Sequence, residues 1–150
     1  MAFKKYSSES FGKRVKEMAE RTGQKVEEAA DQSVRDLFTE IIEETPVGRP
    51  ETWKYPPPRG YEPGNARANW NPSVNAPDTS VTDSKESATY KIKNIEGRVA
   101  GNVVYLTNNV PYIYELEKGW SYLQQPNGWV ERTIRSFDAK LTKTVRNLRK

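Results

Sequence analysis

Proline is concentrated in one internal part of the chain, and this restricts what the rest can fold into. Of the ten prolines among 150 residues, eight lie between Pro46 and Pro77, together with three glycines. Proline fixes φ, lacks a backbone donor and disfavours helix in the residue before it. We therefore expect an extended, irregular arm here, which separates a helical N-terminal part from a mixed C-terminal part.

The arm is too aromatic to be a simple linker. Its densest stretch reads WKYPPPRGYEPG, and the arm carries Trp53, Tyr55, Tyr61 and Trp70, whereas flexible linkers are rich in Gly and Ser. We expect these aromatic side chains to dock on another surface. Within the arm, ARANWNPSVN predicts a short strand over 66–74.

Apolar residues recur every three or four positions before the arm and again at the C-terminal end. The first pattern predicts a continuous helix from about Glu9 to Glu43, roughly 50 Å long at about 1.5 Å per residue. A small domain cannot cover one face of so long a helix, so we expect part of it to meet another subunit. The last pattern, over 130–148, predicts a second amphipathic helix.

Shorter elements are predicted between the arm and the last helix. NVVYLTNN is rich in β-branched and aromatic residues and predicts a strand over 103–107. SKESATYKIKNIEG has some strand alternation but favours a short helix. In VPYIYELEKG, Asn108 and Asn109 can cap a helix of two turns or fewer, Pro111 suits its first turn and Gly119 can end it.

Together these patterns predict a single α+β domain. A long N-terminal helix and a C-terminal helix would pack on a small antiparallel β-sheet, with a long Pro/aromatic-rich arm. The predicted parts are a long helix over 1–43, the arm with its short strand over 44–83, a strand and docking corner over 84–130, and a basic helix over 131–150. The apolar fraction is 35%, below the roughly 45–50% of ordinary globular domains, so the core is modest or a partner completes it. No stretch is apolar enough to span a membrane.

The chain has neither cysteine nor histidine. Without cysteine there are no disulfides or thiolate sites, which agrees with a reducing compartment. Without histidine the chain lacks the side chain best suited to acid–base chemistry near neutral pH. Glu115 and Glu117 could form an acid–base pair, but residues two apart on a helix point in different directions. Asp78, Asp83 and Glu86 match no calcium-loop spacing. We expect no enzyme activity, no metal and no cofactor.

Positive charge is concentrated in the last 20 residues. The net charge of the chain is +4, and residues 131–150 hold seven Lys/Arg and two Asp/Glu, which gives +5 there and −1 elsewhere. One interpretation is the solubilising outer face of an amphipathic helix. The alternative function is a nucleic-acid-binding module, in which this helix contacts phosphates. Its candidate DNA-facing residues are Arg132, Arg135, Lys140, Lys143, Arg146, Arg149 and Lys150.

The order of the motifs resembles the tail-completion, or head–tail joining, proteins of tailed bacteriophages, the neck and minor tail family. The resemblance covers about residues 38–137 and lies in "TPVGRP", "ARANWNPSVNAP" and "VVYLTNNVPYIYELEKGWSYLQQPNGWVERTIRSF". The matching structural positions are Pro46, Gly48, Arg49, Arg67, Asn108, Asn109, Pro111, Glu117, Gly119, Pro126 and Gly128. This sequence departs from the family pattern in the inserted PETWKYPPPRGYEPGN, which enlarges the arm, and in Trp129, where the family has Met.

The resemblance implies a structural virion protein at the head–tail junction, without enzyme activity, present in the host cytoplasm during assembly. Its subunits would form a homo-oligomeric ring, a hexamer or dodecamer, against the phage connector or adaptor and the tail terminator or tube proteins. DNA contact would be secondary. We expect aromatic residues to anchor these interfaces: Trp53, Tyr55, Tyr61, Trp70, Tyr112, Trp120, Tyr122 and Trp129. Glu117 is expected to satisfy nearby backbone N–H groups.

Overall fold

The structure, a computed structural model, describes residues 24–53, 55–57, 59–119 and 128–148, together with Lys13 and Lys16, which are helical. Its elements in chain order are α2 (Gln24–Glu44), η1 (Pro50–Thr52), α3 (Asn65–Ala68), β1 (Trp70–Val74), η2 (Ala88–Ile95), β2 (Val104–Asn108), α4 (Ile113–Glu117) and α5 (Trp129–Leu148). Helices are combined with a two-stranded antiparallel sheet, so the predicted α+β class is confirmed. Within these ranges no helix has the length and apolar character needed to cross a membrane.

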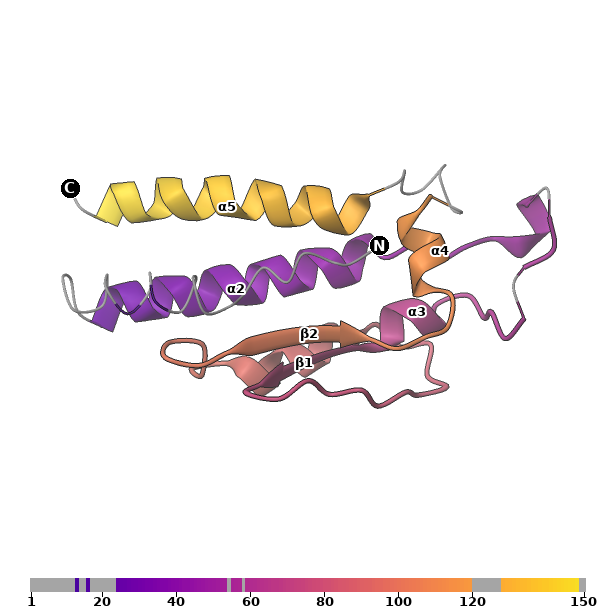
Figure 1. Cartoon of the computed structure of the whole chain (residues 1–150), viewed down its shortest axis with the longest axis horizontal. Helices are drawn as coiled ribbons and strands as arrows, with labels where there is room; N and C mark the ends of the chain where they lie inside the picture. Colours follow the sequence, from indigo (N-terminus) through magenta and orange to yellow (C-terminus); the bar gives the residue numbers. More distant parts are fainter. Residues whose placement is uncertain are drawn as a thin grey trace.

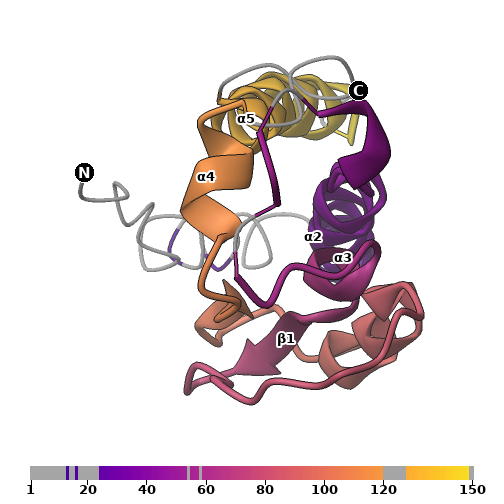
Figure 2. The same cartoon turned by 90° about the vertical axis from the view of Figure 1, so that its right-hand side faces the viewer.

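The elements form layers, with α5 on α2 and α2 on the sheet and η2 (Figures 1 and 2). The sequence predicted that both long helices pack on the sheet, but the body of α5 lies antiparallel on α2. Two strands about 4.8 Å apart are too narrow to seat two helices about 10 Å wide side by side. The first turn of α5 approaches β1, where the rings of Trp129 and Trp70 meet edge to face with centroids 6.4 Å apart.

The two strands separate an apolar face from a polar face. Pro72 lies opposite Leu106 in the register, at a position whose missing N–H would point away from β2. The bond from Asn75 N–H to Val103 O, 2.7 Å long, continues the ladder beyond β1. Trp70, Val74, Val104 and Leu106 share the face that joins the core, whereas Asn71, Ser73, Tyr105 and Thr107 share the other.

The core lies between α2 and the layer of η2 and β1. Ile41 and Ile42 from α2 meet Ile92 and Ile95 from η2, and Trp129 closes the end of the cluster. The apolar positions of α2 have the three-and-four periodicity of an amphipathic helix, so burial of one face against η2 accounts for its pattern.

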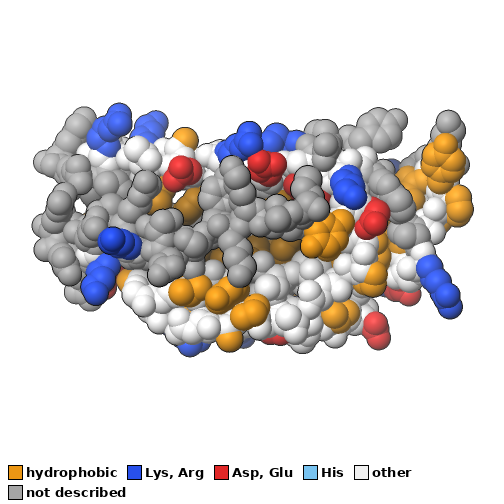
Figure 3. All heavy atoms as spheres, viewed as in Figure 1, with side chains coloured by type: hydrophobic (Ala, Val, Ile, Leu, Met, Phe, Trp, Pro, Cys, Tyr) orange, Lys and Arg blue, Asp and Glu red, His pale blue; other side chains and the backbone are white. Residues whose placement is uncertain are grey.

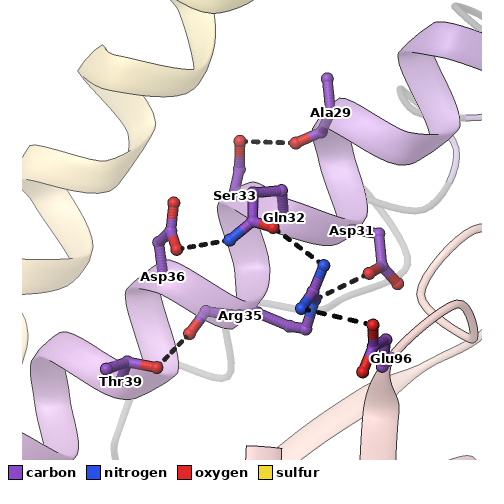
Figure 4. Close-up of polar contacts among 8 residues, drawn as sticks. All are labelled: Ala29, Asp31, Gln32, Ser33, Arg35, Asp36, Thr39 and Glu96. Carbon is purple, nitrogen blue, oxygen red and sulfur yellow. Dashed lines mark hydrogen bonds and ion pairs between the residues drawn. The ribbon is translucent and has the colours of Figure 1, made fainter. Parts of the chain in front are cut away.

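A polar network on α2 links the helix to the layer below it (Figure 4). The guanidinium of Arg35 contacts Asp31 at 2.9 Å and Gln32 at 2.9 Å, and it reaches Glu96 at 3.8 Å, just after η2. Gln32 in turn donates to Asp36 over 2.7 Å. The Arg35–Asp31 pair is largely buried, with side-chain exposures of 24% and 10%, whereas Glu96 is 61% exposed. The contact with Glu96 contributes little stability, about 0–1 kcal/mol, so it orients the helix more than it holds it.

Several predicted elements are confirmed with shifted ends. The long helix ends at Glu44, and its predicted part before Gln24 lies outside the described residues apart from Lys13 and Lys16. The short helix predicted in 84–97 is the 3-10 helix η2. The predicted strand over 103–107 is β2, one residue later, and the small helix is α4.

The predicted strand over 66–74 is wrong in its first part. Residues 65–68 form the helical turn α3 instead, and the strand begins at Trp70. Gly64 precedes α3 with φ 87°, a left-handed conformation that starts the turn at low cost. Asn69 then donates from Nδ2 to Asn65 O over 2.7 Å, which closes the turn from its far side.

The predicted helix cap at Asn108 and Asn109 is also wrong. The residue that precedes α4 is Tyr112, and no side chain caps this helix. The Asn108 side chain instead holds the turn before the helix, where its Oδ1 accepts from Val110 N over 3.2 Å. Asn108 Nδ2 donates to Ala66 O, and Asn109 Nδ2 donates to Thr79 O, each over 2.8 Å. The Nδ2 groups thus make tertiary contacts to α3 and to the loop after β1, whereas the oxygen of Asn108 bonds locally, in the turn before α4 and not in the helix.

Candidate functional site

The end of α2 is joined to β1 by Thr45, Arg67 and Trp70, which we call the helix–strand joint. The buried Thr45 hydroxyl donates to Ile41 O over 2.8 Å and accepts from Trp70 Nε1 over 2.7 Å. Arg67 Nη2 donates to Glu43 O at 2.8 Å and to Thr45 O at 2.9 Å. The last carbonyls of a helix lack partners within it, and here the side chains of Thr45 and of Arg67 from α3 donate to them.

The arm folds back on its own subunit through an aromatic cluster. The Tyr61 ring lies 4.9 Å from the ring of Trp53 and 4.9 Å from that of Tyr112, measured between centroids. Gly48 N–H donates to the Tyr61 hydroxyl over 2.8 Å. A Cβ at Gly48 would collide with the Trp53 ring and the Tyr61 hydroxyl, so the close approach requires glycine. Burial raises the pKa values of the Tyr61 and Tyr112 phenols.

The docking corner, residues 108–130, is closed at its base by Glu117. Its main-chain oxygen accepts from Gly128 N over 2.8 Å, and its carboxylate accepts from Val130 N over 3.1 Å. The carboxylate therefore lies at the N-terminus of α5, where unpaired N–H groups and the helix dipole favour negative charge. The prediction that Glu117 satisfies backbone N–H groups is confirmed. Gly119, with φ 91°, ends α4 as expected.

Burial raises the pKa of Glu117 above its ordinary value of 4.5. The backbone N–H groups of Val130 and Glu131 and the charge of Arg132 act in the opposite direction, and the charge of Glu131 adds to the rise. The carboxylate thus caps α5 although its burial opposes its ionisation.

Four asparagines hold the extended segment 78–84 in place, and we call them the amide set: Asn65, Asn69, Asn71 and Asn109. The Asn69 amide accepts from Thr82 N over 2.8 Å and donates to Thr82 O over 2.9 Å. The other three donate to main-chain oxygens of the segment, which belong to Asp78, Thr79, Ser80, Thr82 and Ser84. All these bonds go to backbone atoms. Sequence reasoning missed the set, and its only signal was the recurrence of Asn around the first strand.

The predicted interface aromatics divide by burial. Trp70, Tyr112 and Trp129 are buried at 7%, 4% and 1% exposure, and they pack within the subunit. Trp53 and Tyr61 are half-buried in the arm cluster, whereas Tyr55 is 71% exposed. Trp120, Tyr122 and Pro126 lie outside the described residues. Tyr114 on α4, which the sequence did not single out, is 48% exposed.

The remaining motif positions surround the joint and the corner. Pro46 and Gly48 are buried just after α2, whereas Arg49 is exposed ahead of η1. Pro111 is exposed and precedes α4 by two residues. Gly128, with φ 77°, precedes α5 and accepts from Arg132 N over 2.9 Å.

The basic residues of α5 are exposed along one edge of the molecule, where Lys and Arg side chains gather (Figure 3). Two of them form ion pairs, Arg135 with Glu131 at 2.6 Å and Lys140 with Glu40 at 3.6 Å. Arg149 and Lys150 lie outside the described residues.

Two of the carboxylates considered for chemistry, Glu117 and Asp78, are committed to structure. Glu117 caps α5, and Asp78 accepts from Ser80 Oγ at 2.6 Å and from Ser80 N at 3.0 Å, which holds the pKa of Asp78 below its ordinary value. Lys91 donates to Ala68 O and Asn71 Oδ1, and burial lowers its pKa. Among the described residues no three acidic side chains come together as a metal site.

Comparison of the chain with protein-family models, with curated proteins and with solved structures finds no match in any of the three. The function of the chain is therefore inferred from its own contacts and from the resemblance of its motifs.

Proposed function

We propose that this chain is a structural virion protein of a tailed bacteriophage, a tail-completion or neck protein that joins tail to head as a subunit of a ring. It acts without catalysis, metal or cofactor. Its partners are its own copies and the connector, terminator or tube proteins at the head–tail junction, and it assembles there from the host cytoplasm.

The observation that carries the proposal is that the separated motifs meet in space. "TPV" and "ARANW" meet in the helix–strand joint through Thr45, Arg67 and Trp70. "TNN" joins "ARANW" through Asn108 and Ala66. "ELEKG" joins "GWV" through Glu117 and Val130. Matches scattered by chance along the chain would not be expected to form one connected set of contacts.

The exposed end of the arm supports a role in assembly. Tyr55 is 71% exposed, and the adjoining Pro56 and Pro57 are exposed as well. The arm extends from the same end of the molecule as α4 (Figure 1), and α4 exposes Tyr114. Aromatic residues are enriched at interface hot spots, and proline reduces the ordering cost of binding. In this proposal the tip of the arm contacts a neighbouring subunit or the connector.

Native mass spectrometry of the purified chain, alone and mixed with tail or connector components of its particle, tests the proposal. We expect a closed ring in the presence of the correct component. Tyr55→Ala should prevent ring formation, and Tyr90→Ala, which truncates an exposed tyrosine on η2, should not. A wild-type chain that stays monomeric with every such component would overturn the proposal, as would complete phages assembled without it.

A further inference from the structure

Helix geometry divides the basic side chains of α5 into two sets. At about 100° per residue, Arg132, Arg135, Lys143 and Arg146 fall within about 80° of arc, and we call these four the basic stripe. The stripe lies on the side opposite Val130, Ile134 and Phe137, which are the buried or half-buried apolar residues of α5. Lys140 lies outside it and is paired with Glu40 of α2.

Three of the four charges of the stripe, those of Arg135, Lys143 and Arg146, are available to an external anion. All four side chains are exposed. Lys143 and Arg146 have no ion pair with a described carboxylate, and the ion pair of Arg135 with Glu131 is mostly exposed on both sides. A surface pair of this kind contributes about 0–1 kcal/mol, so a phosphate can replace the carboxylate at little cost.

The dimensions of the stripe suit an extended polyanion. It runs from Arg132 to Arg146, about 21 Å along the helix at about 1.5 Å per residue. Duplex DNA carries one negative charge per about 1.7 Å of its axis, so roughly a dozen phosphate charges span the same length. Between the two basic pairs the same side carries Ser136 and Ala139, small residues that permit a close approach.

The composition of the stripe favours duplex DNA over other acidic partners as its ligand. It holds no aromatic residue on which an unpaired base could stack, which disfavours single strands. It also lacks the aromatic or large apolar anchors typical of protein hot spots. Arg and Lys alone give contacts to phosphates, which position a protein without reading sequence.

We propose that the basic stripe binds the phosphate backbone of duplex DNA without sequence preference. This inference does not depend on the virion role. Of the five basic residues that the structure describes on α5 it selects four, and it excludes Lys140 although Lys140 is exposed and carries the same charge.

The test is the salt dependence of binding to a fluorescent duplex of random sequence, measured by anisotropy with the full chain. Lys143→Gln and Lys140→Gln form a matched pair, because each removes one lysine from the exposed surface of the same helix. We expect Lys143→Gln to reduce the slope of log affinity against log salt by about 0.9, and Lys143→Gln with Arg146→Gln to reduce it by about 1.8. Lys140→Gln should leave the slope unchanged.

Three results would overturn the proposal. One is absence of salt-dependent binding by the wild-type chain at low salt. Another is an equal reduction of the salt slope by Lys140→Gln and Lys143→Gln, which would indicate that net charge, and not the position of the stripe, decides binding. The third is equal or tighter binding of a single strand or of polyglutamate, which would indicate a different anionic partner. Helical circular dichroism of each variant confirms that the chain is folded.

Discussion

The indole Nε1–H of Trp70 donates to the hydroxyl of Thr45 over 2.7 Å, and the two residues are 25 positions apart in the chain. The same hydroxyl donates to Ile41 O over 2.8 Å. One buried hydroxyl thus connects the last turn of α2 to the first residue of β1, and it fixes the helix against the sheet at the end nearest the arm.

Replacement of Thr45 by valine keeps the shape of the side chain and removes its hydroxyl. Trp70 Nε1 would then be a buried donor without its partner, so we expect the free energy of unfolding to fall by about 1–3 kcal/mol. Chemical denaturation followed by tryptophan fluorescence measures the change.

Thr142→Val is the matched control for this variant. Thr142 also donates to the carbonyl four residues before it, Asp138 O at 2.9 Å, but it is exposed and has no indole partner. Its effect should stay within about 0.5 kcal/mol. Equal effects at Thr45 and Thr142 would contradict the role of the Trp70 contact.

Replacement of Arg67 by lysine keeps the charge and removes the planar fork. The Nη2 atom of Arg67 contacts both Glu43 O and Thr45 O, and a lysine ammonium has different geometry and reach. We expect a loss of about 1–2 kcal/mol in unfolding free energy. Arg98→Lys serves as control, since Arg98 reaches Asn94 O at 3.3 Å from an exposed position. Comparable losses of unfolding free energy in Arg67→Lys and Arg98→Lys would count against a stabilising role of Arg67 in the helix–strand joint.

The raised pKa of Glu117 predicts a pH-dependent stability. Because the folded chain holds this proton more tightly than the unfolded chain, the contribution of Glu117 is most favourable below pH about 4.5 and declines as pH rises through its folded pKa. Glu117→Gln does not titrate. Relative to Glu117→Gln, the wild-type chain should therefore lose stability between pH 4.5 and neutrality.

Denaturant unfolding of both proteins at a series of pH values measures this difference. Glu86→Gln, which removes an exposed carboxylate just before η2, corrects for the general effect of charge. A wild-type chain that gains stability over Glu117→Gln as the pH rises would show that hydrogen bonding to Val130 outweighs burial.

Removal of the Asn69 amide should release one position of segment 78–84. Thr82 N–H donates to Asn69 Oδ1 over 2.8 Å, so Asn69→Ala leaves this amide without its acceptor. We expect faster hydrogen exchange at Thr82, resolved by NMR. Asn109→Ala removes the amide that contacts Thr79 O and should leave exchange at Thr82 unchanged. Unchanged hydrogen exchange at Thr82 in Asn69→Ala would show that the Asn69 amide does not hold segment 78–84 in place.

A methyl group at Gly48 should displace the arm from its own subunit. The added Cβ would collide with the Trp53 ring and the Tyr61 hydroxyl, and overpacking of this kind costs about 1–3 kcal/mol. We expect trypsin to cleave after the exposed Arg59 faster in Gly48→Ala than in the wild-type chain. Equal cleavage rates, with the variant folded, would argue that the arm is not held by the Gly48 contacts.

Local patterns in the sequence were sufficient to predict the elements that depend on local physics. The three-and-four periodicity predicted α2 and α5, and the β-branched run predicted β2 to within one residue. Proline density predicted where regular structure is sparse, because φ restriction acts within one or two residues. The role expected of Glu117, to satisfy backbone N–H groups, came with the resemblance, and its carboxylate accepts from Val130 N.

Tertiary contacts decided the rest, because a side chain that can bond locally is redirected when a distant backbone group offers a buried partner. Asn108 and Asn109 suited a helix cap, but their Nδ2 groups donate to Ala66 O and Thr79 O, and Asn108 Oδ1 accepts from Val110 N in the turn before α4. Residues 66–68 suited a strand but form a turn from which Arg67 reaches the end of α2. The burial of Trp70 and Trp129 against each other likewise results from the meeting of β1 with α5, which no local pattern encodes. The sequence by itself determined where the long helices, the second strand and the arm lie, and the tertiary structure determined which polar and aromatic side chains join them.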